Sequence, residues 1–227
     1  MAAFFEDRLD AGRRLGEVLR DFSGNDAIVV GLSRGGVVVG YAAARYLHLP
    51  LTVLVVRKLG APSNPELAVG AVSETGVRWI DPVTCASTGA DDMYVRAQVQ
   101  EQVEETRLRR DIYTAGTPLE EVRGRSAIVV DDGIATGATA LVGLRSVRDL
   151  GASYVVLATP VASSHAVELL RPEADRVVTL DTSAHFAAVG LYYADFCQVG
   201  DDDVIRYLTM AHEALEEGSD PSELRTD

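Results

Sequence analysis

Five short runs of β-branched and aliphatic residues, separated by helical patterns, constrain the fold of this chain more than any other feature of its sequence. The runs occupy residues 27–31, 51–56, 127–130, 154–159 and 176–180. Each is almost continuously apolar, as expected of a strand that is covered on both faces of a parallel sheet. The helical patterns occupy residues 7–20, 37–47, 140–150 and 164–170. The alternation predicts an α/β fold with an open, mainly parallel five-stranded sheet that is flanked by helices.

A long insertion interrupts this alternation. About seventy residues separate the second run from the third, which is too many for a single crossover. The insertion opens at residues 59–65 with turn formers that predict irregular structure. A β-hairpin of residues 67–72 and 77–80 follows, and then a charged helix at about residues 91–111.

Two C-terminal segments also lie outside the alternation. Residues 181–200 are rich in aromatic side chains, whereas residues 216–227 contain glycine and proline and are expected to be frayed. A length of 227 residues predicts a single domain.

The charge balance disfavours two classes of partner. Asp and Glu number 34 against 21 Lys and Arg, and the formal net charge is −13. Nonspecific binding to nucleic acid requires Lys and Arg to neutralise phosphates, and anionic membranes likewise attract basic surfaces. We therefore expect neither nucleic acid nor a membrane as a partner.

The N-terminal residues and the cysteines are those expected of a cytoplasmic protein. Three of the first ten residues are acidic, where a secretory signal needs basic and then apolar residues. The longest apolar tract, residues 27–44, contains Arg34 and several glycines, which a membrane helix would not tolerate well. Cys85 and Cys197 have no motif spacing and are expected to be free thiols in a reducing compartment.

The segment from Asp131 to Thr139 carries the clearest chemical signal. It reads Asp-Asp-Gly-Ile-Ala-Thr-Gly-Ala-Thr between an apolar run and a helical pattern. A loop that leads into a helix N-terminus presents unpaired backbone N–H groups and partial positive charge, which suit a phosphate. Two carboxylates beside it would repel the ligand unless they bind a neutral or cationic group. Asp131 and Asp132 therefore suggest a ligand that carries a sugar diol close to a phosphate.

This segment resembles the signature of the type I phosphoribosyltransferases, in which two acidic residues precede a Thr-Gly-x-Thr-like loop. The resemblance implies that Asp131 and Asp132 hold the ribose hydroxyls of 5-phosphoribosyl-1-pyrophosphate (PRPP). It also implies a loop that binds the 5-phosphate, formed by Ile134, Ala135, Thr136, Gly137, Ala138 and Thr139.

Two other segments resemble the pyrophosphate site of this family. Residues 31–36 correspond to its pyrophosphate loop, which often contains a non-proline cis peptide, here expected near Ser33–Arg34. The second segment is residues 57–58, at the end of the second apolar run, where the family often places cations. Lys58 is the only lysine of the chain, beside 20 arginines, which favours a functional role. The implied pyrophosphate-binding residues are Ser33, Arg34, Gly35, Arg57 and Lys58.

The resemblance covers about residues 27–180, which form the core of a single domain of residues 1–227. Residues 59–80 correspond to a flexible lid that closes over PRPP and excludes water. Residues 181–200, with the N-terminal segment, correspond to a small hood that covers the base. The candidate base-binding residues in the hood are His185, Phe186, Tyr193 and Phe196.

The implied reaction is displacement at the anomeric carbon of ribose, with pyrophosphate leaving and a ring nitrogen of a base attacking. The resemblance assigns catalytic roles to Asp131, Asp132 and Lys58, and implies a homodimer and a place in nucleotide salvage or metabolism. It also implies Mg²⁺, bound mainly through PRPP with Asp131 and Asp132 as the candidate protein ligands. Ala135 stands where 6-oxopurine transferases usually carry Asp, so the acceptor base is left open.

Two alternatives remain open. Residues 31–35 also fit the Gly-x-Ser-x-Gly elbow of serine α/β-hydrolases, with Ser33 as nucleophile and His185 as base. However, only 32 residues precede Ser33, whereas the elbow normally follows several strands. The other alternative is a regulator that binds PRPP or a nucleotide without turnover. The lid favours catalysis, because a protein that only binds has no need to exclude water.

Overall fold

The computed structural model, which describes residues 4–113 and 115–218, contains the predicted parallel sheet. Its five strands run in the order β2-β1-β6-β7-β8, and every neighbouring pair is parallel. Their bounds are β1 (Ala27–Leu32), β2 (Leu51–Leu54), β6 (Ser126–Val130), β7 (Tyr154–Ser163) and β8 (Arg176–Ser183). This order places the buried strands β1 and β6 near the middle, so their carboxyl ends meet at one edge of the sheet.

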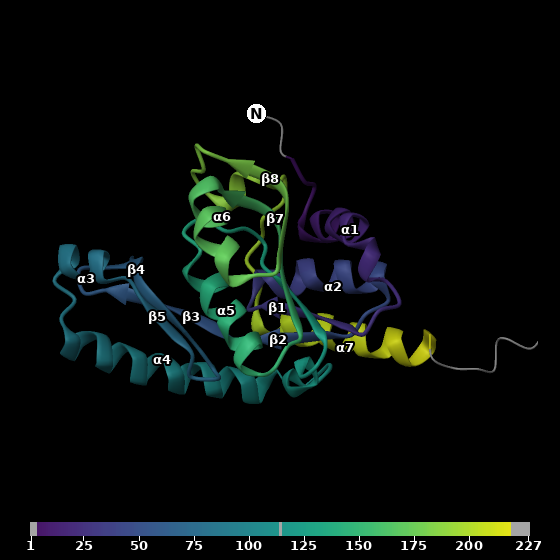
Figure 1. Cartoon of the computed structure of the whole chain (residues 1–227), viewed down its shortest axis with the longest axis horizontal. Helices are drawn as coiled ribbons and strands as arrows, with labels where there is room; N and C mark the ends of the chain where they lie inside the picture. The colour runs from purple at the N-terminus through teal and green to yellow at the C-terminus, as the bar shows by residue number, and fades with distance from the viewer. Residues whose placement is uncertain (1–3, 114, 219–227) are drawn as a thin grey trace, which may run out of the picture.

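Helices cover both faces of the sheet (Figure 1). Alternate residues of the central strands divide between two apolar layers: Val29 and Ile128 pack with α1, α2 and α7, whereas Ile28 and Val129 pack with α5 and α6. The bounds are α1 (Arg8–Val18), α2 (Gly35–Leu47), α5 (Ala138–Asp149), α6 (Ser164–Leu170) and α7 (Asp201–Gly218). Short 3-10 turns lie at η1 (Arg20–Phe22), η2 (Leu119–Val122), η3 (Arg171–Glu173) and η4 (Val189–Tyr192).

The helix α7 was not predicted, and it corrects part of the expected frayed tail. Residues 216–218 belong to α7, while residues 219–227 lie outside the described part of the chain. Val204, Leu208 and Ala211 are buried against α2 and β2. Three aspartates form the first turn of α7, where they interact favourably with the positive end of the helix dipole.

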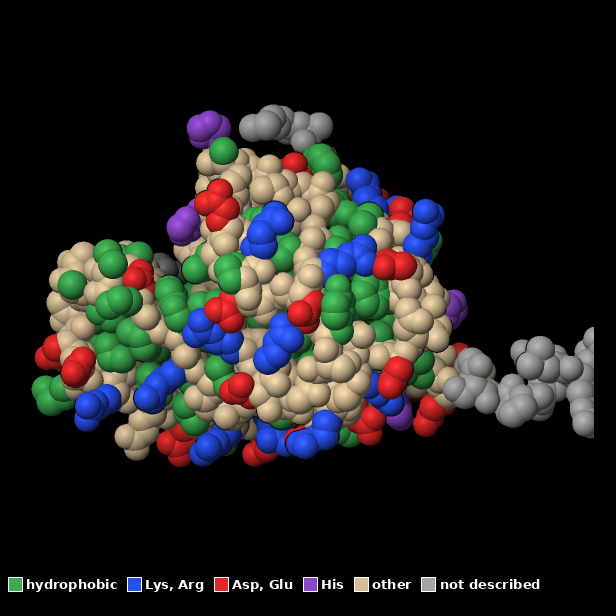
Figure 2. Space-filling view, viewed as in Figure 1, with side chains coloured by type: hydrophobic (Ala, Val, Ile, Leu, Met, Phe, Trp, Pro, Cys, Tyr) green, Lys and Arg blue, Asp and Glu red, His purple; other side chains and the backbone are tan. Residues whose placement is uncertain are grey.

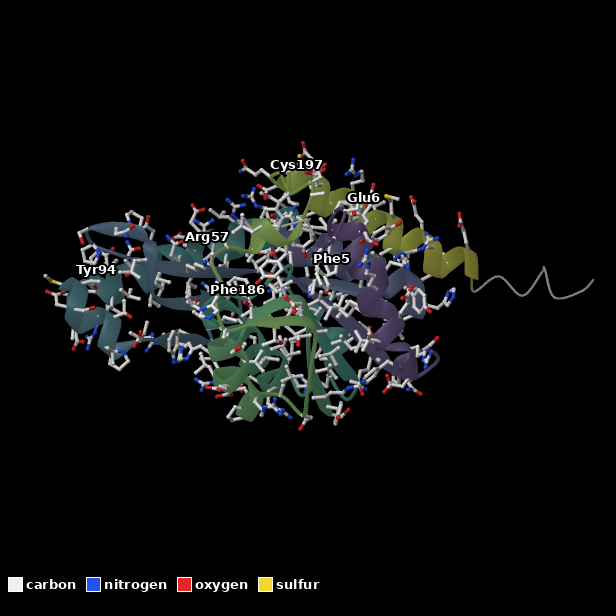
Figure 3. The ribbon with its side chains drawn as sticks, turned by 90° about the horizontal axis from the view of Figure 1, so that it is seen from above. Phe5, Glu6, Arg57, Tyr94, Phe186 and Cys197 are labelled. Carbon is white, nitrogen blue, oxygen red and sulfur yellow. The ribbon has the colours of Figure 1, made fainter. Side chains whose placement is uncertain are left out.

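A second, antiparallel sheet forms a lobe that projects from the main body, on the left of Figure 1. Its strands are β3 (Val56–Ala61), β4 (Asn64–Ser73) and β5 (Arg78–Ile80), followed by α3 (Pro82–Thr88) and α4 (Asp92–Ile112). The predicted hairpin is confirmed as β4 and β5, which pair Gly70 with Ile80. α4 is fastened to this sheet by Tyr94 (Figure 3), whose hydroxyl donates to the Gly60 carbonyl at 2.9 Å.

The expected boundaries at the start of this lobe were wrong in two places. The second apolar run is divided at Val55 into β2 and β3, and much of residues 59–65 belongs to strands rather than to irregular structure. The antiparallel pairing of β3 with β4 accommodates the turn formers because its register shifts on both sides of Gly60. Only Pro62 and Ser63 lie between the two strands.

Glu74 is a buried carboxylate at the junction between the lobe and the main sheet. Its Oε1 accepts a hydrogen bond from the Val55 N–H at 2.9 Å, and its own N–H donates to the Val55 carbonyl at 3.0 Å. Its Oε2 makes no hydrogen bond within the described residues and lies 3.4 Å from Arg110 Nε. Burial raises the pKa of Glu74 to about 7.

We expect Glu74→Gln to flatten the dependence of stability on pH. Above pH 7 the Glu74 carboxylate is charged and buried in the folded protein, which lowers the free energy of unfolding. This loss of stability disappears as the pH falls from 7 toward the ordinary pKa of 4.5, because the buried carboxyl becomes protonated. The free energy of unfolding of the parent should therefore gain up to about 3 kcal/mol relative to the variant between pH 8 and pH 5. Urea titrations of both proteins across this range measure the difference. Glu17→Gln, on the exposed side of α1, is the control, and identical pH profiles for parent and Glu74→Gln would contradict the prediction.

The exposed surface shows no concentration of basic charge on the face in Figure 2, where blue and red side chains are interspersed. Among the described helices, none combines the length and the apolar composition that a membrane span requires.

Candidate active site

The carboxyl ends of β1 and β6 open into a pocket of about 300 Å³ that is also lined by two residues of β3, Val56 and Lys58. Most of the predicted site residues line it, although they come from four separate parts of the sequence. The lining is formed by Leu32, Ser33, Arg34, Gly35, Val56, Lys58, Asp131, Asp132, Gly133, Ile134, Ala135, Thr136, Gly137, Thr139, Val189 and Phe196. Ala138 is buried beneath the loop instead.

The loop that was predicted to bind phosphate connects β6 to α5 and is held firmly to β7. Ile134 donates its N–H to the Val161 carbonyl and accepts from the Ser163 N–H, each at 2.9 Å. Ser163 Oγ also donates to the Ala135 carbonyl at 2.6 Å. Gly137 has φ of 88° immediately before α5, a left-handed conformation that favours glycine. The unpaired N–H groups of the first helical turn therefore border an open pocket, as an anion site requires.

The two predicted carboxylates stand at the start of this loop and are only partly exposed. Asp131 accepts a hydrogen bond from the Asp132 N–H through Oδ1, at 2.9 Å. Burial raises the pKa of both carboxyls, and the neighbouring Asp132 charge adds to the rise at Asp131. Arg8 opposes the rise at Asp132, because its Nε lies 2.8 Å from Asp132 Oδ2. Both acids line the pocket, and among the described residues Asp132 alone of the two is paired with an arginine.

Arg8 is a site residue that the sequence analysis missed. It is the first residue of α1, and 124 positions separate it from Asp132. A contact between residues so far apart leaves no local spacing signal in a single sequence, so only the fold reveals it.

The predicted pyrophosphate loop connects β1 to α2, and its Ser33–Arg34 peptide bond is cis, as expected. Gly36 allows α2 to begin close to β6, because a Cβ at this position would lie 2.4 Å from the Val130 carbonyl oxygen. The Arg34 guanidinium lies 3.7 Å from Asp201, which also accepts from Arg109 at 2.8 Å. Asp201 thereby connects this loop to α4 and to the start of α7.

The structure separates the two cations that were predicted to bind pyrophosphate. Lys58 lines the pocket, whereas Arg57 (Figure 3) does not and donates from Nε to Gln102 of α4 at 2.9 Å. Both lie in β3, where successive side chains point to opposite faces. The geometry therefore favours Lys58 alone as a ligand-binding cation from this strand.

The segment predicted to be a hood, residues 181–200, contacts the N-terminal segment through a β-bridge between Phe5 and Tyr193. Phe5 and Tyr193 pack together, with ring centroids 5.4 Å apart, and Phe186 packs beside them (Figure 3). Of the aromatic candidates only Phe196 lines the pocket, together with Val189.

Tyr193 and His185 were predicted to bind the base, but neither lines the pocket. Tyr193 is buried, and its hydroxyl donates to the Asp132 carbonyl at 2.6 Å, so it supports the acid pair. His185 is exposed, and its backbone N–H donates to Ser183 Oγ. No histidine is among the described residues that line the pocket around Ser33, so the hydrolase geometry is not formed.

Comparisons with known proteins identify a family model, similar sequences and a similar structure. The family model described as a phosphoribosyl transferase domain matches residues 7–195. Two proteins from strains of Mycobacterium tuberculosis, each named "Putative phosphoribosyl transferase", are 43% identical over 223 residues, which is 96% of this chain and 50% of theirs. The chain thus spans about half the length of these curated relatives. The crystal structure of the protein TT1426 from Thermus thermophilus is 42% identical with a TM-score of 0.71, and covers 91% of this chain and 98% of its own.

Proposed function

Because this chain belongs to the phosphoribosyl transferase domain family, we propose that it transfers the 5-phosphoribosyl group of PRPP to a nitrogenous base and releases pyrophosphate. The observation that carries the proposal is that Asp131 and Asp132 line the same pocket as the loop of residues 134–139, which is predicted to bind phosphate. A role in nucleotide salvage or metabolism follows from this reaction.

Each part of PRPP has a chemically suitable position in the pocket. The 5-phosphate would accept hydrogen bonds from the backbone of residues 135–139 and from Thr136 and Thr139. The pyrophosphate would lie against residues 33–35 and Lys58. The ribose diol would donate to Asp131 and Asp132, and the base would stack on Phe196 beside Val189.

Little covalent chemistry by the protein is required. The bond from the anomeric carbon to pyrophosphate breaks as the bond from this carbon to a ring nitrogen forms, and positive charge develops on the ribosyl ring. Asp131 and Asp132 would stabilise this charge, while the two loops hold the reacting groups in line.

The pocket also fits Mg²⁺ carried by the substrate. Mg²⁺ usually keeps several waters and binds one or two carboxylates together with substrate phosphates. The described residues contain no cluster of three or more side chains able to hold a metal, but Asp131 and Asp132 provide carboxylate oxygens at the pocket. When bound, Mg²⁺ would neutralise charge on the leaving pyrophosphate.

A panel of bases tests the proposed reaction. The protein is incubated with PRPP, Mg²⁺ and one purine, pyrimidine or pyridine base at a time, and released pyrophosphate is measured. We expect at least one base to raise the release well above the rate with PRPP alone. If PRPP binds but no base accelerates the release, the protein is a PRPP-binding regulator rather than a transferase.

A further inference from the structure

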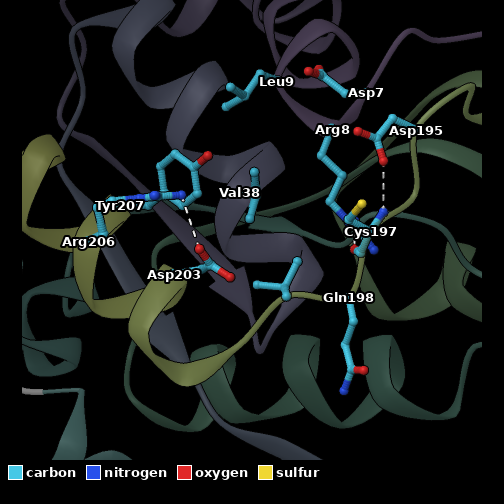
Figure 4. Close-up of a pocket in the computed structure, with 11 residues that line it drawn as sticks. Asp7, Arg8, Leu9, Val38, Asp195, Cys197, Gln198, Asp203, Arg206 and Tyr207 are labelled. Atoms are coloured by element: carbon cyan, nitrogen blue, oxygen red, sulfur yellow. Dashed lines mark hydrogen bonds and ion pairs between the residues drawn. The ribbon is translucent and has the colours of Figure 1, made fainter.

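Arg8 connects the acid pair to the hood through three contacts of one guanidinium. Its Nε lies 2.8 Å from Asp132 Oδ2, and its Nη1 donates to the Cys197 carbonyl at 2.8 Å. Its Cζ lies 3.8 Å from the centre of the Phe196 ring, so the guanidinium stacks on this aromatic face. Figure 4 shows Arg8 beside Cys197, between α1 and the segment that leads into α7. The Arg8 side chain is only 11% exposed, and its contact with Asp132 is partly buried, whereas its contact with the Cys197 carbonyl lies at the surface.

Each carboxylate of the acid pair has one oxygen that is bonded within the protein and one that is available to a ligand. Arg8 occupies Asp132 Oδ2, and the Asp132 N–H occupies Asp131 Oδ1. Within the described residues, Asp132 Oδ1 and Asp131 Oδ2 have no hydrogen bond from the protein. A carboxylate held at one oxygen presents the other in a fixed orientation, which is what recognition of a diol requires.

Gly35 makes room for the pair between Arg8 and Asp132. A Cβ at this position would lie 1.9 Å from Asp132 Oδ2 and 3.1 Å from Arg8 Nε. The pyrophosphate loop therefore packs directly against the ion pair, and any larger residue at position 35 must displace it.

We propose that Arg8 is a positioning residue that gives the pocket its selectivity for ribose over 2-deoxyribose. This inference rests on the proposed function, because it assigns the acid pair to the sugar hydroxyls. Arg8 fixes Asp132 through one oxygen, so that the free oxygen accepts from a ribose hydroxyl without losing rotational freedom on binding. The same guanidinium holds the Phe196 ring, which fixes the sugar position relative to the base position.

Binding of two sugar phosphates tests this role without requiring turnover or a known acceptor. Calorimetry with ribose 5-phosphate and with 2-deoxyribose 5-phosphate gives the ratio of their dissociation constants. We expect the parent to prefer ribose 5-phosphate by about 10- to 100-fold, as for one hydrogen bond to a charged group. We expect Arg8→Lys to reduce this preference to within about threefold, because an ammonium cannot make the same planar set of contacts.

Arg14→Lys is a matched control on the same helix. Arg14 has an acid partner, Asp10 at 2.8 Å, and lies 5.4 Å from the Phe5 ring, but it does not line the pocket. It should retain the preference of the parent. Should Arg8→Lys fail to fold, Gly35→Ala displaces the pair with both charges present, and it should lose the preference as well.

The outcomes separate the inference from the proposed function. If the parent binds neither sugar phosphate, the PRPP site is wrong and the role of Arg8 falls with it. If the parent prefers ribose 5-phosphate and Arg8→Lys keeps that preference, only the role of Arg8 is overturned. Equal binding of both sugars by the parent also overturns this role.

Discussion

Replacing Asp131 by Asn is expected to lower turnover by about 10²- to 10⁴-fold while making the free protein more stable. The carboxylate would stabilise positive charge that develops on the ribosyl ring, and an amide of nearly the same shape cannot do so. In the free protein, burial and the adjacent Asp132 raise the pKa of Asp131, so its charged form is unfavourable there. Removing this charge should raise Tm by about 2–6 °C at pH 7, as expected for about 1–2 kcal/mol in a chain of this size.

Two measurements check this prediction. Pyrophosphate release is followed with whichever base is most active in the panel, and thermal unfolding is followed without ligand. Asp26→Asn is the control, because Asp26 is exposed and pairs with Arg125 far from the pocket. Turnover equal to that of the parent would refute a catalytic role for Asp131, and a lower Tm would refute the argument from burial.

Replacing Lys58 by Met should weaken binding of PRPP by about 10- to 100-fold. Lys58 lines the pocket from strand β3, and its positive charge opposes the rise that burial causes in the pKa of Asp131. A charge-assisted hydrogen bond to pyrophosphate is worth roughly 1.5–3 kcal/mol, which corresponds to this loss. The dissociation constant of PRPP with Mg²⁺ is measured by calorimetry.

Arg57→Met provides the matched control for Lys58→Met. Arg57 is the preceding residue on the same strand, but it is bonded to Gln102 and lies outside the pocket. It should change the dissociation constant by less than about threefold. Equal losses in the two variants would mean that β3 contributes general positive charge rather than one defined contact.

The parallel core could be predicted from the sequence because its signals are local. Each buried strand is a continuous apolar run, and the segment from Asp131 to Thr139 contains both the acid pair and the loop in consecutive residues. Since consecutive positions at the carboxyl end of one strand must lie at one edge of the sheet, the sequence predicts that these residues lie together, and they line one pocket.

The features that were missed depend on contacts between distant segments. Val204, Leu208 and Ala211 form a narrow apolar stripe in an acidic segment, and α7 is stabilised by packing on α2 and β2. Tyr193 offers an aromatic surface in the sequence, yet in the fold its hydroxyl supports the backbone of Asp132.

The misplaced boundary of β3 also affects what is predicted for Arg57 and Lys58. Because the turn formers at residues 59–65 predict irregular structure, the sequence alone places Arg57 and Lys58 at the end of a strand and predicts the same role for both. A strand that continues to Ala61 sends the two side chains to opposite faces, and this alternation would have favoured one of them.

Electron density for ribose 5-phosphate in a crystal of the intact chain tests the central claim most directly. The account predicts the phosphate within hydrogen-bond distance of the backbone N–H groups of residues 135–139, and the sugar hydroxyls against the carboxylates of Asp131 and Asp132. A phosphate bound instead at residues 33–35, or a sugar whose hydroxyls point away from both carboxylates, would contradict it.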